Sequence, residues 1–206
     1  GNVYKTVTIG EQVWMAENLA YLPSVVGPAT GSKATPCYYV YGYDGTNVSA
    51  AKATNNYNTY GVLYNQPAAM TACPVGWRLP SDTDWTQLEN YLADNGYNYD
   101  GSTGGGRAKI AKSLASASGW NSHSWPGSVG NTDYPAYRNK SGFSALPGGN
   151  VYGKFESVGY EGTWWSSSEI SEYYAWVRHL YYNASDIRRT DSPRENGHSV
   201  RCVWNE

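Results

Sequence analysis

Residues 73–85 read Cys73-Pro74-Val75-Gly76-Trp77-Arg78-Leu79-Pro80-Ser81-Asp82-Thr83-Asp84-Trp85. This stretch predicts a tight turn between two helices. The Ala-rich segment before it has proline in its first turn, where a helix tolerates it, and Pro74 ends that segment. After the turn, Ser81 is a good N-cap and Asp84 can complete a capping box. The sequence therefore predicts one helix that ends near Cys73 and a second from about Asp82 to about Asp94.

The second predicted helix has one apolar face. Trp85, Leu88 and Leu92 follow at i, i+3 and i+7, which is the spacing of an amphipathic helix packed on a core. We expect three tryptophans in the core: Trp77, Trp85 and Trp164. Arg78 lies in the turn, where it can pair with carboxylates or backbone carbonyl groups, so we expect it to be structural.

The rest of the chain predicts short strands between loops. Residues 4–9 and 12–16 alternate around Gly10-Glu11 and predict a hairpin with a type II′ turn. Further strands are expected at 37–41, 164–166, 175–180 and 199–204. A third short helix is expected within 107–117, with Ile110 and Leu114 inward, and residues 50–53 allow another. Residues 119–139 look like a loop anchored by Trp120 and Trp125. The pattern is α+β and loop-rich: two or three helices packed on short, mostly antiparallel strands.

Composition limits the class of protein. The 206 residues suit one domain, residues 1–206, and a net charge of −2 gives no basic surface for nucleic acid. There is no run of about 18 apolar residues, so the chain predicts no membrane span. Tyrosine (20), tryptophan (9) and glycine (23) are abundant, whereas phenylalanine (2) is rare. Aromatic side chains with a polar end suit a wet binding surface, although a core that uses Trp and Tyr in place of Leu explains them too.

Catalytic motifs give little support for an enzyme. The histidines are His123, His179 and His198, and none lies in a metalloprotease or zinc motif. Asp82-Thr83-Asp84 resembles a metal-binding Asp-x-Asp, but helix capping explains it. Four carboxylates within 156–172 leave open a glycan-active hydrolase: Glu156, Glu161, Glu169 and Glu172. Solvated or turn-capping roles are the simpler interpretation of these residues.

Six segments, the turn among them, carry a family resemblance. They are Val13-Trp14-Met15-Ala16-Glu17-Asn18-Leu19, Tyr60-Gly61-Val62-Leu63-Tyr64-Asn65, Gly76-Trp77-Arg78-Leu79-Pro80, Gly142-Phe143-Ser144-Ala145-Leu146-Pro147-Gly148-Gly149, Trp164-Trp165-Ser166-Ser167-Ser168-Glu169 and Ser199-Val200-Arg201-Cys202-Val203. In this order they resemble the Fibrobacter succinogenes major paralogous domain. The resemblance implies a C-type-lectin-like fold related to the formylglycine-generating enzyme superfamily. Such folds host many activities, so the resemblance alone does not give the function.

The resemblance also has implications for the cysteines and for metal. In lectin-like folds the cysteine that ends the first helix bonds to the last strand, which implies a Cys73–Cys202 disulfide and a free Cys37. Formylglycine-generating enzymes use two late cysteines, whereas only Cys202 is late here. This departure argues against the same oxidation chemistry. Calcium is common in these folds, and four loop residues could supply oxygen ligands, although they form no ordered motif: Asp44, Asn47, Asp133 and Asp186.

Residues 170–198 form a polar window that we predict to be the binding region. The window contains four tyrosines and four arginines, with too few apolar positions to bury them all. Tyr, Arg, Ser, Asn and Asp are the residues of a binding surface. The predicted ligand-binding residues are Tyr173, Tyr174, His179, Tyr181, Tyr182, Asp186, Arg188, Arg189, Asp191, Arg194 and His198.

The window also resembles the variable region of proteins diversified by retroelements. Those systems mutate adenines, so Asn codons never become Lys, Gln or Met, and none of these three occurs between residues 170 and 198. An ordinary polar hairpin with Arg–Tyr stacking explains the same composition.

The leading hypothesis is a non-enzymatic module that binds a protein or carbohydrate ligand. We expect it on the surface of a bacterial cell or in a secreted protein, after removal of a signal peptide. The alternatives are the hydrolase described above and a structural adhesin domain. Ligand identity and oligomeric state are not predicted.

Overall fold

The stretch around residues 73–85 folds as predicted in the computed structural model, which describes residues 2–205. Helix α3 (Gln66–Ala72) ends with Cys73 as its C-cap. Strand β5 (Trp77–Arg78) follows, and helix α4 (Asp82–Asp94) begins at Ser81 with both hydrogen bonds of the capping box. Arg78 donates to both carboxylate oxygens of Asp84, so its structural role is confirmed.

The apolar face of α4 lies in the core. Trp85, Leu88 and Leu92 have no exposed surface, and Trp85 packs against Trp14 at 4.8 Å between ring centroids. Trp164 is equally buried, so two of the three tryptophans were predicted correctly. Trp77 is only half-buried, because it closes the edge of the core against the exposed ring of Trp204.

The two ends of the chain share a small sheet. Strands β1 (Thr6–Ile9) and β2 (Gln12–Met15) form the predicted hairpin, with Gly10 at a φ of +63°. Strand β11 (Val203–Trp204) is shorter than predicted and lies between β2 and β5 in the order β1-β2-β11-β5. The Cys73–Cys202 disulfide is present beside this sheet, and Cys37 is free and buried.

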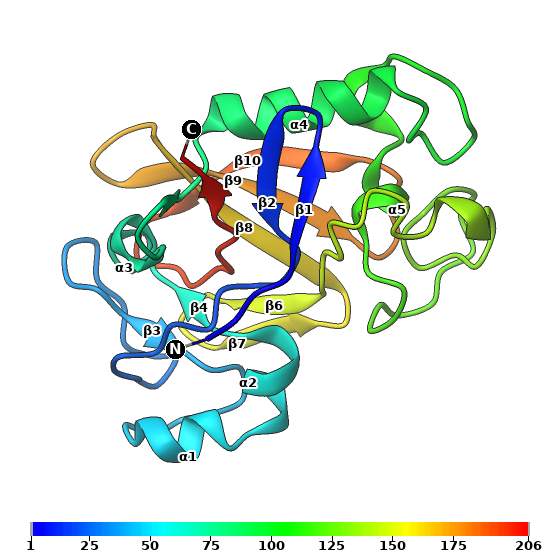
Figure 1. The fold of residues 1–206 in the computed structure, drawn as a ribbon. Helices are drawn as coiled ribbons and strands as arrows, with labels where there is room; N and C mark the ends of the chain where they lie inside the picture. Colours follow the sequence, from blue (N-terminus) through cyan, green and yellow to red (C-terminus); the bar gives the residue numbers. More distant parts are fainter. Residues whose placement is uncertain (1, 206) are drawn as a thin grey trace.

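A larger sheet carries the polar window. Its order is β10-β9-β8-β6-β7, from β6 (Gly148–Val151), β7 (Phe155–Val158), β8 (Glu161–Glu169), β9 (Tyr174–Tyr181) and β10 (Ile187–Pro193). All pairs except β6–β8 are antiparallel. Strands β8 and β9 were predicted from the sequence, whereas β6, β7 and β10 were not. The window is therefore a long hairpin whose second strand, β10, lies at the edge of the sheet (Figure 1).

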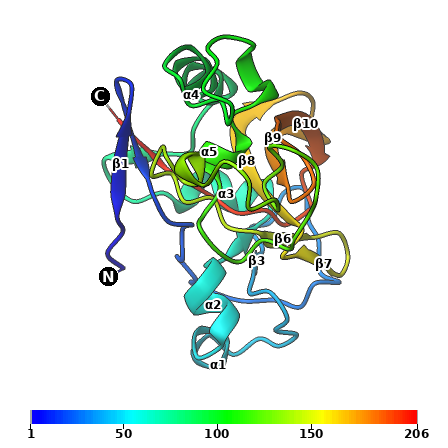
Figure 2. The ribbon, with the colours of Figure 1, turned by 90° about the vertical axis from the view of Figure 1, so that its right-hand side faces the viewer.

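Short elements complete an α+β fold. They are β3 (Tyr38–Tyr39) paired with β4 (Leu63–Tyr64), helices α1 (Val48–Lys52), α2 (Asn55–Tyr60) and α5 (Ala111–Leu114), and 3-10 turns η1 (Gly106–Ala108) and η2 (Pro135–Tyr137). Figure 2 shows the β1–β2 hairpin and the β8–β10 strands on opposite sides of the molecule, with α4 at one end and α1 and α2 at the other. The third predicted helix is broken into η1 and α5, and Ile110 and Leu114 are buried as expected.

A buried lysine organises the loop of residues 119–139. The Lys112 ammonium donates to the carbonyl oxygens of Asn131 and Asp133, at 2.8 and 2.7 Å, and to the carboxylate of Asp133. The other carboxylate oxygen of Asp133 accepts from the backbone of Gly127. Trp120 also anchors the loop, by donating to the carbonyl oxygen of Ala145.

Trp125 does not anchor this loop, contrary to the prediction from sequence. Its side chain is 62% exposed. The loop does not need its burial, because the Lys112 cluster and backbone hydrogen bonds already fix the chain there.

Candidate functional site

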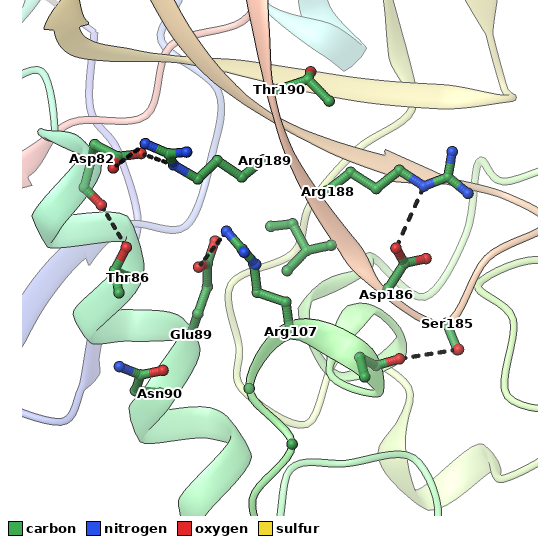
Figure 3. Close-up of a pocket in the computed structure, with 14 residues that line it drawn as sticks. Asp82, Thr86, Glu89, Asn90, Arg107, Ser185, Asp186, Arg188, Arg189 and Thr190 are labelled. Atoms are coloured by element: carbon green, nitrogen blue, oxygen red, sulfur yellow. Dashed lines mark hydrogen bonds and ion pairs between the residues drawn. The ribbon is translucent and has the colours of Figure 1, made fainter.

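A polar groove lies between α4, η1 and the edge strand β10 (Figure 3). Its volume is about 1060 Å³, and the groove is open to solvent. Three charged pairs line it: Asp82 with Arg189, Glu89 with Arg107, and Asp186 with Arg188. Side chains from α4, from η1 and from the window therefore meet in one place.

The floor of the groove is formed by two carboxylates, with a buried arginine between them and behind the groove surface. Asp82 and Glu89 are seven residues apart on α4, which is two helical turns, so they share one face. Strand β9 points Arg178 at that face. Arg178 has no exposed side-chain surface, donates from Nη1 to Asp82 Oδ1 at 2.8 Å, and donates from Nε to Glu89. A buried charge needs such partners, and Arg178 has them on both sides.

Arg189 extends this network to the surface. The sheet register places Arg189 opposite Arg178, so both guanidinium groups reach Asp82. Arg189 donates from Nε and Nη2 to the two oxygens of Asp82, at 2.8 and 2.9 Å. The guanidinium also stacks on Trp176, with its central carbon Cζ 3.3 Å from the centre of the Trp176 ring. Arg189 is thus held by a bidentate ion pair and by stacking, which makes one wall of the groove rigid.

The two carboxylates have opposite pKa shifts. Partial burial alone would raise the pKa of Asp82, but hydrogen bonds from Arg189 and Arg178 outweigh it and hold the pKa below its ordinary value. Burial dominates at Glu89 and raises its pKa, although Arg178 and Arg107 oppose the shift. Asp82 is therefore a fixed negative charge at neutral pH.

Two arginines at the groove remain open to solvent. The Arg107 side chain is 43% exposed and lies 3.8 Å from Glu89, and the Arg188 side chain is 53% exposed and lies 3.4 Å from Asp186. A guanidinium has five N–H donors, so these single long ion pairs leave donors for a ligand. The polar side chains of Asn90, on α4, and Thr190, on β10, also line the groove (Figure 3).

The predicted binding residues do not share one face. Along β9 and β10 successive side chains alternate between the two sides of the sheet. Asp186, Arg188 and Arg189 line the groove. Tyr174 and Asp191 belong to the face of Arg189 but lie beyond the groove. Tyr181 belongs to the opposite face together with Arg188, whose guanidinium carbon lies 4.9 Å from the centre of the Tyr181 ring. Tyr173 and Arg194 lie at the far end of the hairpin, and Tyr182 lies in the β9–β10 turn.

His179 and His198, which we expected to be exposed, are interior residues. Their exposed fractions are 4% and 0%. His179 Nδ1 lies 2.6 Å from a carboxylate oxygen of Glu161, and His198 Nε2 lies 2.8 Å from the hydroxyl of Ser192. Burial, reinforced by the nearby His179, lowers the pKa of His198 well below its ordinary value. Because each histidine has a polar partner inside the fold, both can be buried despite their polarity.

The carboxylates of the hydrolase hypothesis are spread over the sheet. Glu161 is engaged with His179, whereas Glu169 lies 3.2 Å from Arg194 at the other end of β8. Eight residues of strand separate Glu161 from Glu169, which is roughly 26 Å and far beyond the separation of a glycosidase pair. Glu156 pairs with Lys154, and Glu172 is exposed after β8.

The four calcium candidates are engaged at separate places. Asn47 caps α1, Asp133 accepts from Lys112, Asp186 pairs with Arg188, and Asp44 lies against Gly27. Among residues 2–205 no group of three or more His, Cys, Asp and Glu side chains gathers in a metal-binding arrangement. Over the same residues, no helix has both the length and the apolar character needed to cross a bilayer.

Sequence reasoning missed most of the groove. It assigned Asp82 to capping and did not single out Glu89 or Arg107. The seven-residue spacing of Asp82 and Glu89 was visible, but nothing in the sequence indicated that an arginine about 90 residues later lies between them.

The fold and groove define an α+β domain with a preformed polar groove beside an edge strand. The model of the Fibrobacter succinogenes major domain matches residues 7–204. The chain therefore belongs to the Fibrobacter succinogenes major domain family. No curated protein and no solved structure matches it.

Proposed function

We propose that this domain is a non-enzymatic module that binds a protein or carbohydrate ligand through the groove. The observation that carries the proposal is the rigid charged floor in a groove that also holds two solvent-exposed arginines. Arg178 fixes Asp82 and Glu89, Arg107 lies beside Glu89, and Arg188 lies beside Asp186 at the rim of the groove; both exposed guanidinium groups have free donor capacity. Binding sites gain affinity when their polar groups are ordered before the ligand arrives.

The proposal extends to a C-type-lectin-like fold. The ordered motifs along the chain support it, as does the disulfide between the end of α3 and the segment before β11. The same disulfide supports an oxidising compartment, such as a bacterial cell surface or the extracellular space.

Retroelement diversification is part of the same proposal. The window forms a hairpin between two of the segments that carry the family resemblance, 164–169 and 199–203, and Asp186, Arg188 and Arg189 of the window reach the groove. Diversity in the hairpin would then change the ligand, while Asp82, Glu89 and Arg107 lie outside the window and stay the same. A reverse transcriptase gene beside a near-copy of the 3′ end of the gene would support this step.

The test is a double substitution with a matched control. The variant Arg107→Ala/Arg188→Ala removes both open guanidinium groups. The control, Lys52→Ala/Lys154→Ala, removes two positive charges away from the groove. Surface changes of this kind usually alter stability by less than about 0.5 kcal/mol each, so both should melt close to the wild type.

Ligands are identified with a glycan array and by pull-down from extracellular protein, both with wild-type domain. We expect the groove variant to lose at least tenfold in affinity and the control to bind like the wild type. Equal binding by the wild type and the groove variant contradicts the proposal.

A further inference from the structure

Four rings form an exposed strip beside the groove. The aromatic strip consists of Trp125, His123, Tyr182 and Tyr160. Trp125 is 62% and Tyr160 is 50% exposed, and the other two are half-buried. The centre of the His123 ring lies 5.0 Å from the centre of the Trp125 ring and 5.3 Å from that of Tyr182. The centres of the Tyr182 and Tyr160 rings lie 5.1 Å apart. Each contact is edge-to-face, so the rings support one another.

The strip is assembled from three separate parts of the chain. His123 and Trp125 belong to the loop of residues 119–139, Tyr160 to the β7–β8 turn, and Tyr182 to the β9–β10 turn. Backbone hydrogen bonds join these parts: Gly130 donates to the carbonyl oxygen of Tyr182, and Tyr182 donates to that of Tyr160. The backbone segments that carry the rings are therefore fixed to one another, and the ring-to-ring contacts hold the side chains at the surface.

Stability does not explain the exposure of Trp125. The Lys112 ammonium and Trp120 already fix its loop, and an exposed tryptophan adds little to a core. Large rings held at a surface by their neighbours are typical of ligand contacts, because little side-chain entropy is lost on binding.

The chemistry of the strip indicates the class of ligand. His123 Nδ1 accepts from the backbone N–H of Trp125 at 3.2 Å, so a neutral ring carries its proton on Nε2 as a donor. The side chain of Asn121 lies beside Gly159, the residue that precedes Tyr160. The strip thus combines ring faces with neutral hydrogen-bonding groups, and its four side chains carry no permanent charge.

We propose that the aromatic strip is a stacking platform for a neutral carbohydrate chain. One face of a pyranose ring is made of C–H groups, which pack against the electron-rich face of an aromatic ring. The hydroxyl groups at the sugar's edge then meet donors and acceptors such as His123 and Asn121. Phosphorylated or acidic ligands would find no cation on the strip itself.

This inference rests on the proposed binding function and gives its ligand a chemical class. The strip and the groove lie on either side of the β9–β10 turn, because Tyr182 belongs to the strip and Asp186, four residues later, lines the groove. A carbohydrate chain stacked on the strip would reach the polar groove with its next residues.

The experiment uses the whole domain and soluble polysaccharides. Electrophoretic mobility is measured in gels that contain a neutral β-glucan, xylan or galactomannan, or an acidic polyuronate. The variant Trp125→Ala/Tyr160→Ala removes the two exposed rings. The control, Trp204→Ala, removes a tryptophan that is 46% exposed on β11, outside the strip and the groove. Circular dichroism verifies that each variant is folded.

We expect at least one neutral polysaccharide to retard the wild type, with affinity reduced at least tenfold in the strip variant and unchanged in Trp204→Ala. Neutral-polysaccharide binding that survives in the strip variant overturns the inference. Binding only to polyuronate, or only to a protein partner, overturns it too. If binding to the polyuronate or to the protein partner is lost in Arg107→Ala/Arg188→Ala, the proposed function stands without the inference. If neither array, gels nor pull-down yields a ligand, both fail.

Discussion

Single residues in this protein are decisive where a charge is buried. Arg178 is the clearest case, because it has no exposed side-chain surface and bonds to both Asp82 and Glu89. An arginine in a strand would ordinarily be predicted to face solvent. The expectation of an exposed His179 failed in the same way, since a buried partner, Glu161, compensates its polarity. Sequence patterns predict burial from apolarity and do not see such partners.

Arg178→Met should be strongly destabilising. The substitution leaves Glu89 buried without its main partner, and breaking a buried ion pair in this way costs about 3–5 kcal/mol. Urea unfolding measures the loss. The double variant Arg178→Met/Glu89→Gln removes the orphaned charge and should recover part of it. A double variant no more stable than Arg178→Met would show that Glu89 is not the source of the loss.

Ionised Asp82 should make the free energy of unfolding fall at acidic pH. Its pKa is lower in the folded protein than in the unfolded chain, because Arg189 and Arg178 stabilise the carboxylate. The ionised carboxylate therefore contributes its full stabilisation at pH values above the pKa of Asp82 in the unfolded chain. This stabilisation is lost as the pH falls through the lower pKa of Asp82 in the folded protein. The stability difference between wild type and Asp82→Asn should be largest near neutral pH and shrink as the pH falls below 3.8, the ordinary pKa of an aspartate. A difference that is the same at neutral pH and in strong acid would contradict this assignment.

Lys112→Met should loosen the loop of residues 119–139. The ammonium is the common partner of three oxygen atoms, and hydrogen bonds to a charged group contribute about 1.5–3 kcal/mol each. We expect lower stability and faster proteolysis within residues 119–139. Lys109→Met, an exposed lysine before α5, is the control. Cleavage at the wild-type rate in Lys112→Met would exclude the ammonium as the anchor.

At the scale of elements, local signals decided which parts of the fold were predictable. Helices α3 and α4 and the β1–β2 hairpin have caps, stop signals or alternation within a few residues, and all were predicted. Strand β10 has none of these signals, because its side chains are polar on both faces of the sheet. One face reaches the charged floor of the groove. The groove itself depends on partners far apart in sequence, so it could not be predicted from local patterns.

The cap and core face of α4 should differ in their energetic weight. Ser81→Ala removes one bond of the capping box and should cost about 1 kcal/mol, whereas Trp85→Ala should cost about 3–5 kcal/mol. Thermal or urea unfolding measures both, with the exposed Thr83→Ala as control. If Trp85→Ala melts like the wild type, α4 does not pack through this face.

For the whole molecule, the disulfide is a long-range covalent constraint. It joins residues 129 positions apart, and the chain-entropy model gives such a link about 4–5 kcal/mol before strain. Its pairing followed from the family resemblance and not from spacing. The variant Cys73→Ser/Cys202→Ser should therefore unfold at much lower urea concentration, while Cys37→Ser should change little by comparison. Equal midpoints for wild type and double variant would mean that the link adds no net stability.

The position of β11 has a consequence for how the protein is made. This strand lies inside the first sheet, between β2 and β5, and Cys202 immediately precedes it. During synthesis the amino-terminal hairpin leaves the ribosome almost two hundred residues before its sheet partner. The hairpin must therefore wait, with the edge of β2 unpaired, until residues 203 and 204 emerge. A ribosome stalled just short of them would hold a nascent chain with an open sheet and an unpaired Cys73, a substrate for chaperones and thiol oxidases.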